Sequence, residues 1–291
     1  MSLAVTDLIA LSAIALLGLP HGGFDGAIAL MMNWHKKKQG MAAFLLLYLA
    51  ISAGIIMLWF MAPVLCLGLF LVISLIHFGL GDMQFISLPA DYQKAFFRFV
   101  KVIGIFCHGG LVTIALPAFH PEQAGQIFQI LSGEDAILLI PVLSGLLPVW
   151  CAALVFYLGL STHLKSLRGF AIELVILGFV IWILPPLAGF ALYFCGFHSL
   201  RHMISLFRAL PKEMSYATSI KMGLFFSALS WAAGLAGFIF LHFIGGIQQS
   251  DAILQITFIG LAALTMPHML LVDMIFRPRQ HSPSSHNRGM I

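Results

Sequence analysis

The chain has 291 residues, of which 60 % are hydrophobic and 9 % are charged, and its mean hydropathy is +1.01. Ordinary soluble domains carry roughly 25 % charged residues, so this composition excludes that class and indicates an integral membrane protein. The formal net charge of +4 is spread over short connections and forms no basic patch, which excludes a surface for nucleic acid.

Hydropathy and helix breakers predict an all-α fold, a polytopic bundle of nine transmembrane helices in a single domain, residues 1–276. A spanning helix requires about 20 apolar residues, and such runs follow one another along nearly the whole chain. The first run lacks the basic region and cleavage site of a signal peptide, so we expect it to be retained as a helix. The remaining residues, 277–291, are predicted to form a short polar cytoplasmic tail. The nine predicted helices cover residues 7–34, 41–61, 63–86, 95–117, 136–160, 168–185, 186–208, 219–243 and 252–275.

The positions of Lys and Arg predict the orientation of this bundle. Apart from Arg201, every Lys and Arg lies in the tail or in and beside the connections that follow the first, third, fifth and seventh helices. Because cytoplasmic connections are enriched in Lys and Arg, we expect an outside N-terminus, a cytoplasmic C-terminus and a location in the cell (inner) membrane. Arg201 lies within a span, where it is either a functional residue or one whose long side chain extends toward the cytoplasmic surface.

Five histidines within the predicted spans are candidate functional residues, because ionisable groups in a membrane are costly. Their helices all run from outside to cytoplasm, and at about 1.5 Å per residue the five histidines share a layer about 18–24 Å below the outer surface. This shared depth predicts a single site. Two of the five are four residues apart and lie on one helical face, as in metal-binding helices, whereas a lone histidine such as His108 can simply bond to a neighbouring helix. The five are His21, His77, His198, His202 and His268.

An all-histidine site is chemically suited to zinc, copper, iron or nickel, so the ligand type does not choose the metal. The four cysteines lie in apolar runs without CxxC spacing, which argues against thiolate ligands. Metal-bound histidines usually donate their second N–H to a carboxylate or carbonyl. Three of the motifs carry an aspartate four or five residues after the histidine: Asp25, Asp82 and Asp273. Each is a candidate additional ligand or bonding partner of a ligand. The alternative is a solvated group at a helix end, favoured for Asp82 and Asp273.

Four motifs, taken in their order along the chain, resemble those of the Brp/Blh family of membrane β-carotene 15,15'-dioxygenases. The resemblance implies cleavage of the central 15,15' double bond of β-carotene with O2 to give two molecules of all-trans-retinal. It also implies Fe(II) held by His21, His77, His198 and His202, and a link to microbial rhodopsins, which need retinal. His268 would be a fifth ligand, a partner of a ligand or a residue beside the substrate. The motifs are Pro20-His21-Gly22 with Asp25, His77-Phe78-Gly79 with Asp82, His198-Ser199 with Arg201-His202, and Pro267-His268.

Two other classes of function compete with this one. The first is a membrane protein that binds a retinoid, a carotenoid or a metal without catalysis, and the second is a haem-binding subunit for electron transfer. Cytochromes with two haems need histidine pairs at two depths, and a proton relay needs ionisable groups across the whole membrane. A single histidine layer therefore favours one non-haem metal ion.

Overall fold

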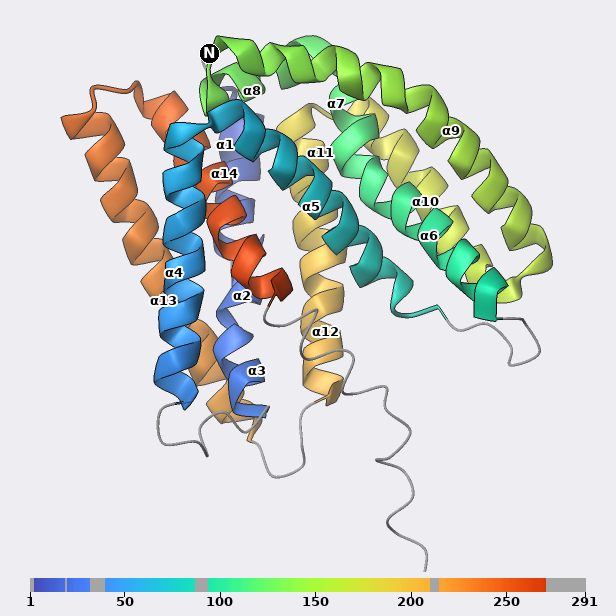
Figure 1. The fold of residues 1–291 in the computed structure, drawn as a ribbon, viewed down its shortest axis with the longest axis horizontal. Helices are drawn as coiled ribbons and strands as arrows, with labels where there is room; N and C mark the ends of the chain where they lie inside the picture. The colour runs from blue at the N-terminus through green and yellow to red at the C-terminus, as the bar shows by residue number, and fades with distance from the viewer. Residues whose placement is uncertain (1–2, 19, 32–39, 87–93, 210–214, 271–291) are drawn as a thin grey trace, which may run out of the picture.

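The computed structural model describes residues 3–18, 20–31, 40–86, 94–209 and 215–270, without the side chains of residues 21, 27, 30, 31, 94 and 209. Every regular element in these ranges is a helix, which confirms the predicted all-α class (Figure 1). The residues of the predicted tail, 277–291, lie outside the described ranges. The helices, with π and 3₁₀ segments labelled η, are α1 (Val5–Ala13), η1 (Ile14–Gly18), α2 (Pro20–Gly23), α3 (Asp25–Met31), α4 (Gly40–Met61), α5 (Pro63–Met83), α6 (Lys94–Gly110), η3 (Leu111–Ala115), α7 (Leu116–Phe119), α8 (Pro121–Ser132), η4 (Glu134–Leu138), α9 (Leu139–His163), α10 (Lys165–Ile183), α11 (Pro186–Tyr193), η5 (Phe194–Ser199), α12 (Leu200–Ala209), α13 (Tyr216–Ile239), η6 (Phe240–Ile244) and α14 (Gln249–His268).

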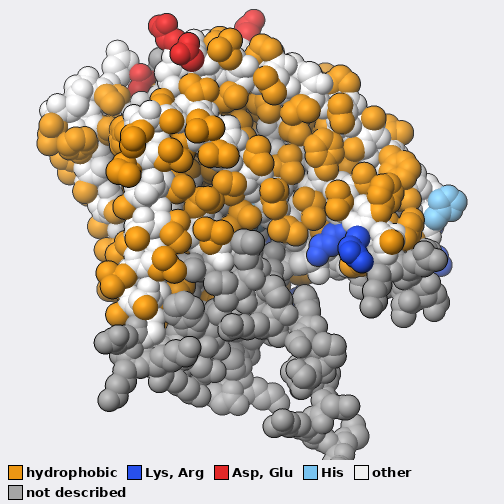
Figure 2. Space-filling model, viewed as in Figure 1, with side chains coloured by type: hydrophobic (Ala, Val, Ile, Leu, Met, Phe, Trp, Pro, Cys, Tyr) orange, Lys and Arg blue, Asp and Glu red, His pale blue; other side chains and the backbone are white. Residues whose placement is uncertain are grey.

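Seven helices in the described ranges are long and apolar enough to cross a membrane. They are residues 40–61, 63–83, 95–119, 134–163, 165–183, 216–244 and 249–268, and each coincides with one of the nine predicted spans. Their surfaces carry large apolar side chains: Leu46, Val155 and Phe225 are 68 %, 69 % and 65 % exposed. Figure 2 shows such side chains over most of one face. A surface of this kind is compatible with lipid and not with water, so the chain is a membrane protein.

The other two predicted spans, 7–34 and 186–208, are broken into shorter pieces. The first consists of α1, η1, α2 and α3, and the second of α11, η5 and α12. The π segments η1 and η5 pack against each other so closely that a Cβ at Gly18 would lie 2.3 Å from Cε1 of Phe194. Backbone carbonyls at this break accept bonds from other helices, with Trp231 Nε1 2.7 Å from Ala15 O and Cys195 Sγ 3.4 Å from Ala13 O. Irregular backbone at membrane depth is tolerated where neighbours bond to it in this way.

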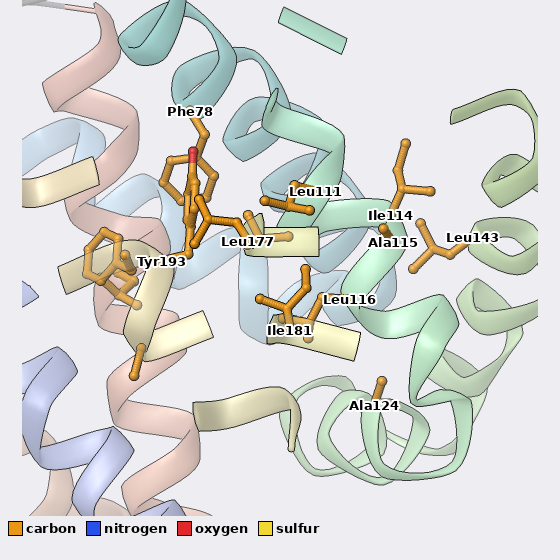
Figure 3. Packing of buried hydrophobic residues seen from close by; sticks show 14 of the residues in the cluster. Phe78, Leu111, Ile114, Ala115, Leu116, Ala124, Leu143, Leu177, Ile181 and Tyr193 are labelled. Atoms are coloured by element: carbon orange, nitrogen blue, oxygen red, sulfur yellow. The ribbon is translucent and has the colours of Figure 1, made fainter. Parts of the chain in front are cut away.

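Helices α5 and α6 approach each other through glycine. A Cβ at Gly79 would lie 2.3 Å from the carbonyl oxygen of Ile105, and one at Gly109 would lie 1.8 Å from that of Leu75. The glycine two residues after His77 therefore serves close helix packing. The largest cluster of buried apolar side chains adjoins this contact and includes Phe78, Leu111 and Tyr193 (Figure 3).

Helix α8 lies where the sequence predicted a connection between two spans. It begins at Pro121 and ends before Gly133, whose φ of +85° is readily adopted only by glycine. Two carbonyls of its last turn accept side-chain bonds from other helices, with Trp59 Nε1 2.9 Å from Leu131 O and Gln255 Nε2 2.7 Å from Ile130 O. These bonds fix α8 against α4 and α14, at the same end of the molecule as the N-terminus (Figure 1).

Candidate metal centre

Four of the five candidate histidines lie in contact inside the bundle. His77 near the end of α5 faces His198 in η5, with ring centroids 4.7 Å apart and Nε2 atoms 3.0 Å apart. His268 at the end of α14 lies 5.1 Å from the His77 ring and 4.9 Å from the His202 ring. All four are buried, with exposed fractions of 2 % to 7 %. The structure thus joins predicted helices three, seven and nine at one point.

The break in the seventh predicted span determines how its two histidines are presented. His198 belongs to the π segment η5, and His202 belongs to the α-helix that follows it. A π turn is wider than an α turn. Two residues that are four apart therefore do not lie one above the other here, as they would in a regular α-helix. Instead His198 contacts His77 and His202 contacts His268. A Cβ at Gly81 would lie only 3.3 Å from Cε1 of His198, so glycine leaves room for that ring.

Asp25 holds the ring of His268. Its Oδ1 lies 2.7 Å from Nδ1 of His268, and its Oδ2 accepts a bond from the hydroxyl of Tyr48 at 2.9 Å. In this contact with a carboxylate, a neutral imidazole carries its proton on Nδ1 and its lone pair on Nε2. Asp25 is 2 % exposed, so the alternative of a solvated group is wrong for it. The two described partners of Asp25 therefore lie on other helices, Tyr48 on α4 and His268 on α14, 243 residues along the chain.

Asp82 and Arg201 belong to a second buried network. Oδ1 of Asp82 accepts a bond from Nη1 of Arg201 at 2.8 Å, and Oδ2 accepts one from the hydroxyl of Tyr193 at 3.0 Å. Nδ1 of His108 lies 3.4 Å from the same Oδ2, and Nη2 of Arg201 bonds to Glu173. Asp82 is 1 % exposed and Arg201 is 20 % exposed. The solvated interpretation of Asp82 is wrong, and so is the alternative in which Arg201 extends to the surface, because Asp82 and Arg201 satisfy each other's charge inside the bundle.

This second network runs parallel to the histidine contact. Asp82 follows His77 by five residues and Arg201 follows His198 by three, so the same two segments are joined once by imidazoles and again by an ion pair. Arg201 is also held between aromatic rings, with Cζ 5.6 Å from the centroid of Phe170 and 5.8 Å from that of Phe197. The ion pair therefore fixes α5 against η5 and α12 beside the histidines.

No hydroxyl donor to Asp25 or Asp82 was predicted from the sequence, and the structure supplies Tyr48 and Tyr193 in these roles. The sequence signal that could have identified these donors was a tyrosine within an apolar run, because a buried tyrosine hydroxyl needs a hydrogen-bond partner. His108, left open as a lone polar contact between helices, bonds to Asp82 and lies 3.3 Å from the Tyr157 hydroxyl. The side chain of His21 and the whole of Asp273 lie outside the described residues, so their predicted roles stay predictions.

Imidazole is a common metal ligand, and the described contacts can be compared with a metal site. Two imidazole nitrogens bound at right angles to one ion, at roughly 2.1 Å each, lie about 3.0 Å apart. The two Nε2 atoms of His77 and His198 have this separation of 3.0 Å, which is also that of a hydrogen bond between a protonated and an unprotonated imidazole nitrogen. Among the residues with described side chains, no three His, Cys, Asp or Glu form a group at metal-binding distances. The described rings form instead a chain of pairwise contacts, His198 to His77 to His268 to His202.

Comparisons with known proteins give one consistent result. The family model described as "Beta-carotene 15,15'-dioxygenase" matches residues 12–276. A protein of that name from the uncultured marine bacterium 66A03 is 36 % identical over 288 residues, which cover 96 % of this chain and 97 % of that protein. The "Probable beta-carotene 15,15'-dioxygenase Blh" of Halobacterium salinarum is 26 % identical over 294 residues, covering 89 % of this chain and 81 % of that one. No solved structure matches.

Proposed function

Because the chain belongs to the β-carotene 15,15'-dioxygenase family, we propose that it cleaves the central 15,15' double bond of β-carotene with O2 to give two molecules of all-trans-retinal. One C=C bond is broken and each of its carbons gains one oxygen atom from O2. The observation that carries this proposal, beside the family match, is the buried contact of four histidines on three predicted spans.

The proposed cofactor is Fe(II), with His21, His77, His198 and His202 as ligands. His268 is the candidate for a further ligand, because Asp25 turns its Nε2 electron pair away from the carboxylate. When bound, iron would supply the activation of O2 that an alkene alone does not provide. The histidines contribute no charge when neutral, so the charge of a bound cation would not be cancelled by its imidazole ligands themselves.

The chain's own residues orient and protect such a site. Asp25 fixes the tautomer and orientation of His268, and the ion pair of Asp82 and Arg201 fixes the two segments that carry His77 and His198. Burial of the four imidazoles excludes bulk water from the site. A substrate that is insoluble in water reaches this site from lipid, which is the physical reason for an enzyme built within the bilayer.

We also propose that the two broken spans cross the membrane, which gives nine crossings in all. The N-terminus would then lie outside and the C-terminus in the cytoplasm, with the protein in the cell's inner membrane. Figure 2 supports this orientation, because acidic side chains gather at the end that carries α8 and basic side chains gather at the other. Reporter fusions at residue 3 and residue 35, which flank the first broken span, should give opposite locations, and so should fusions at residues 184 and 212, which flank the second. A microbial rhodopsin is the proposed acceptor of the retinal.

The proposal is tested by supplying β-carotene to purified, iron-loaded protein and measuring retinal by chromatography. Alanine at His77, His198 or His202, and at His21, should abolish both retinal formation and iron retention. His163 is exposed at the end of α9, and its replacement by alanine is the matched control that should change neither. Iron retained by all of these variants would contradict the ligand assignment, and absence of retinal from the native protein would contradict the enzyme assignment. A Soret absorption band would identify haem instead.

A further inference from the structure

An apolar cleft adjoins the histidines on the side of α8. Five elements line it, namely α5, α7, α8, α11 and α14, together with part of η3. Its lining side chains include Phe78, Leu116, Ala124, Phe128, Phe190 and Phe258, and three of them, Phe78, Leu116 and Ala124, are labelled in Figure 3. No charged side chain lines it among the described residues. A hydrocarbon can therefore enter the cleft without removing water from an ionised group.

The only hydroxyl groups in the described lining belong to Ser74 and Thr113. The hydroxyl of Thr113 donates to the carbonyl of Gly109 in its own helical segment at 3.0 Å, so its bonding capacity is used there. Such a lining is suited to an occupant without polar groups.

Aromatic rings connect the cleft directly to the histidines. Phe78 lines the cleft and lies 4.7 Å from the ring of His198. Phe190, also in the lining, stacks on Phe194 at 5.3 Å, and Phe194 in turn stacks on His198 at 6.0 Å. Phe258 extends this row, 5.6 Å from Phe190. A flat conjugated chain that follows these rings leads from the cleft to the imidazoles.

One wall of the cleft is formed by α8, through Ala124, Ile127, Phe128 and Leu131. The bonds from Trp59 and Gln255 to the last turn of α8 hold this helix against its neighbours. A long polyene presents many double bonds of nearly equal reactivity, so cleavage at one bond requires that an end of the molecule be held at a set distance from the metal.

We propose that this cleft receives one half of β-carotene with its terminal ring against α8, and that the distance from α8 to His77 and His198 selects the central double bond. This inference rests on the proposed function for the identity of the substrate. The reaction itself is unchanged: O2 supplies one oxygen atom to each carbon of the broken bond, and a bond displaced from the centre would give two aldehydes of unequal length in place of two retinal molecules.

The test is Ala124→Phe, which places a ring in the cleft from a residue that is 3 % exposed. The control is Ala152→Phe, the same change on the exposed side of α9. Binding of β-carotene to iron-free protein in lipid nanodiscs, followed by the carotenoid absorption band, should weaken about tenfold or more in Ala124→Phe and stay unchanged in the control. With iron-loaded protein, the remaining product should include aldehydes of unequal length.

Phe128→Ala provides a second test, because it enlarges the cleft that Ala124→Phe fills. It also tests the inference if Ala124→Phe does not fold. The enlarged cleft should still bind β-carotene, but the deeper position of the ring should again give unequal aldehydes. The inference is overturned if every folded variant binds β-carotene as the native protein does and gives retinal as its sole product. Lipid or detergent would then fill the cleft instead. If the native protein makes no retinal, the proposed function fails, while the binding measurements still support or overturn the cleft as a carotene site.

Discussion

The ion pair of Asp82 and Arg201 allows a quantitative test of how the histidine segments are held. Arg201→Met keeps the length and packing of the side chain but removes its charge. Asp82, 1 % exposed, then loses its closest cationic partner, and breaking one side of a buried pair costs about 3–5 kcal/mol. Tyr193 and His108 still contact Asp82, so we expect the lower end, about 3 kcal/mol, or about a hundredfold in the unfolding equilibrium.

Equilibrium unfolding in mixed detergent micelles, followed by tryptophan fluorescence, measures this loss. Arg98→Met, at an exposed position on α6, is the matched control and should change stability by less than about 1 kcal/mol. Adding Asp82→Asn to Arg201→Met should restore part of the lost stability, because no unpaired charge then remains on α5. A loss below about 1 kcal/mol in Arg201→Met would refute the view that this pair holds α5 against α12.

Three further variants test separate contacts. Asp25→Asn should weaken iron retention about 10- to 100-fold against a competing chelator, because His268 loses its carboxylate; retention equal to the native protein would contradict that role. Tyr48→Phe removes one donor to the same carboxylate and should cost about 1.5–3 kcal/mol in the unfolding assay, and no measurable loss would mean that Asp25 is satisfied without it. Gly79→Ala should destabilise the protein by about 1–3 kcal/mol or prevent its folding, since a Cβ there would lie 2.3 Å from the Ile105 carbonyl oxygen. Gly54→Ala on α4, where a Cβ would meet nothing within 4 Å, should instead be neutral or stabilising, and equal losses in both glycine variants would rule out the proposed close contact.

Residue type and hydropathy were sufficient to predict the membrane class and the candidate histidines. Hydropathy is a property of each segment alone, and seven predicted spans are continuous helices at the predicted places. The cost of an ionisable group in lipid is likewise local, which is why His77, His198, His202 and His268 could be selected before their contact was known. Their common depth followed from helix direction and rise per residue.

The partners of these residues depended on the tertiary structure. Asp25 was selected because it lies one turn after His21, but its described partners are Tyr48 on α4 and His268 on α14, and Asp82 pairs with Arg201 across 119 residues. A buried carboxylate is stabilised by the donors that surround it in space, and sequence spacing along one helix does not identify donors on other helices.

The broken helices and the cleft were likewise decided by packing. A π turn is unfavourable in an isolated helix, and η1 and η5 persist where they pack against each other and where Trp231 and Cys195 bond to nearby carbonyls. Helix α8 has too few residues to be recognised as a membrane span, and its position is fixed by bonds from α4 and α14. The sequence by itself determined that the chain lies in a membrane and which histidines could bind a metal, because those properties are sums over local residues. Only the tertiary structure decided how the imidazoles meet and where a carotene can lie beside them, because both depend on contacts between helices far apart in the chain.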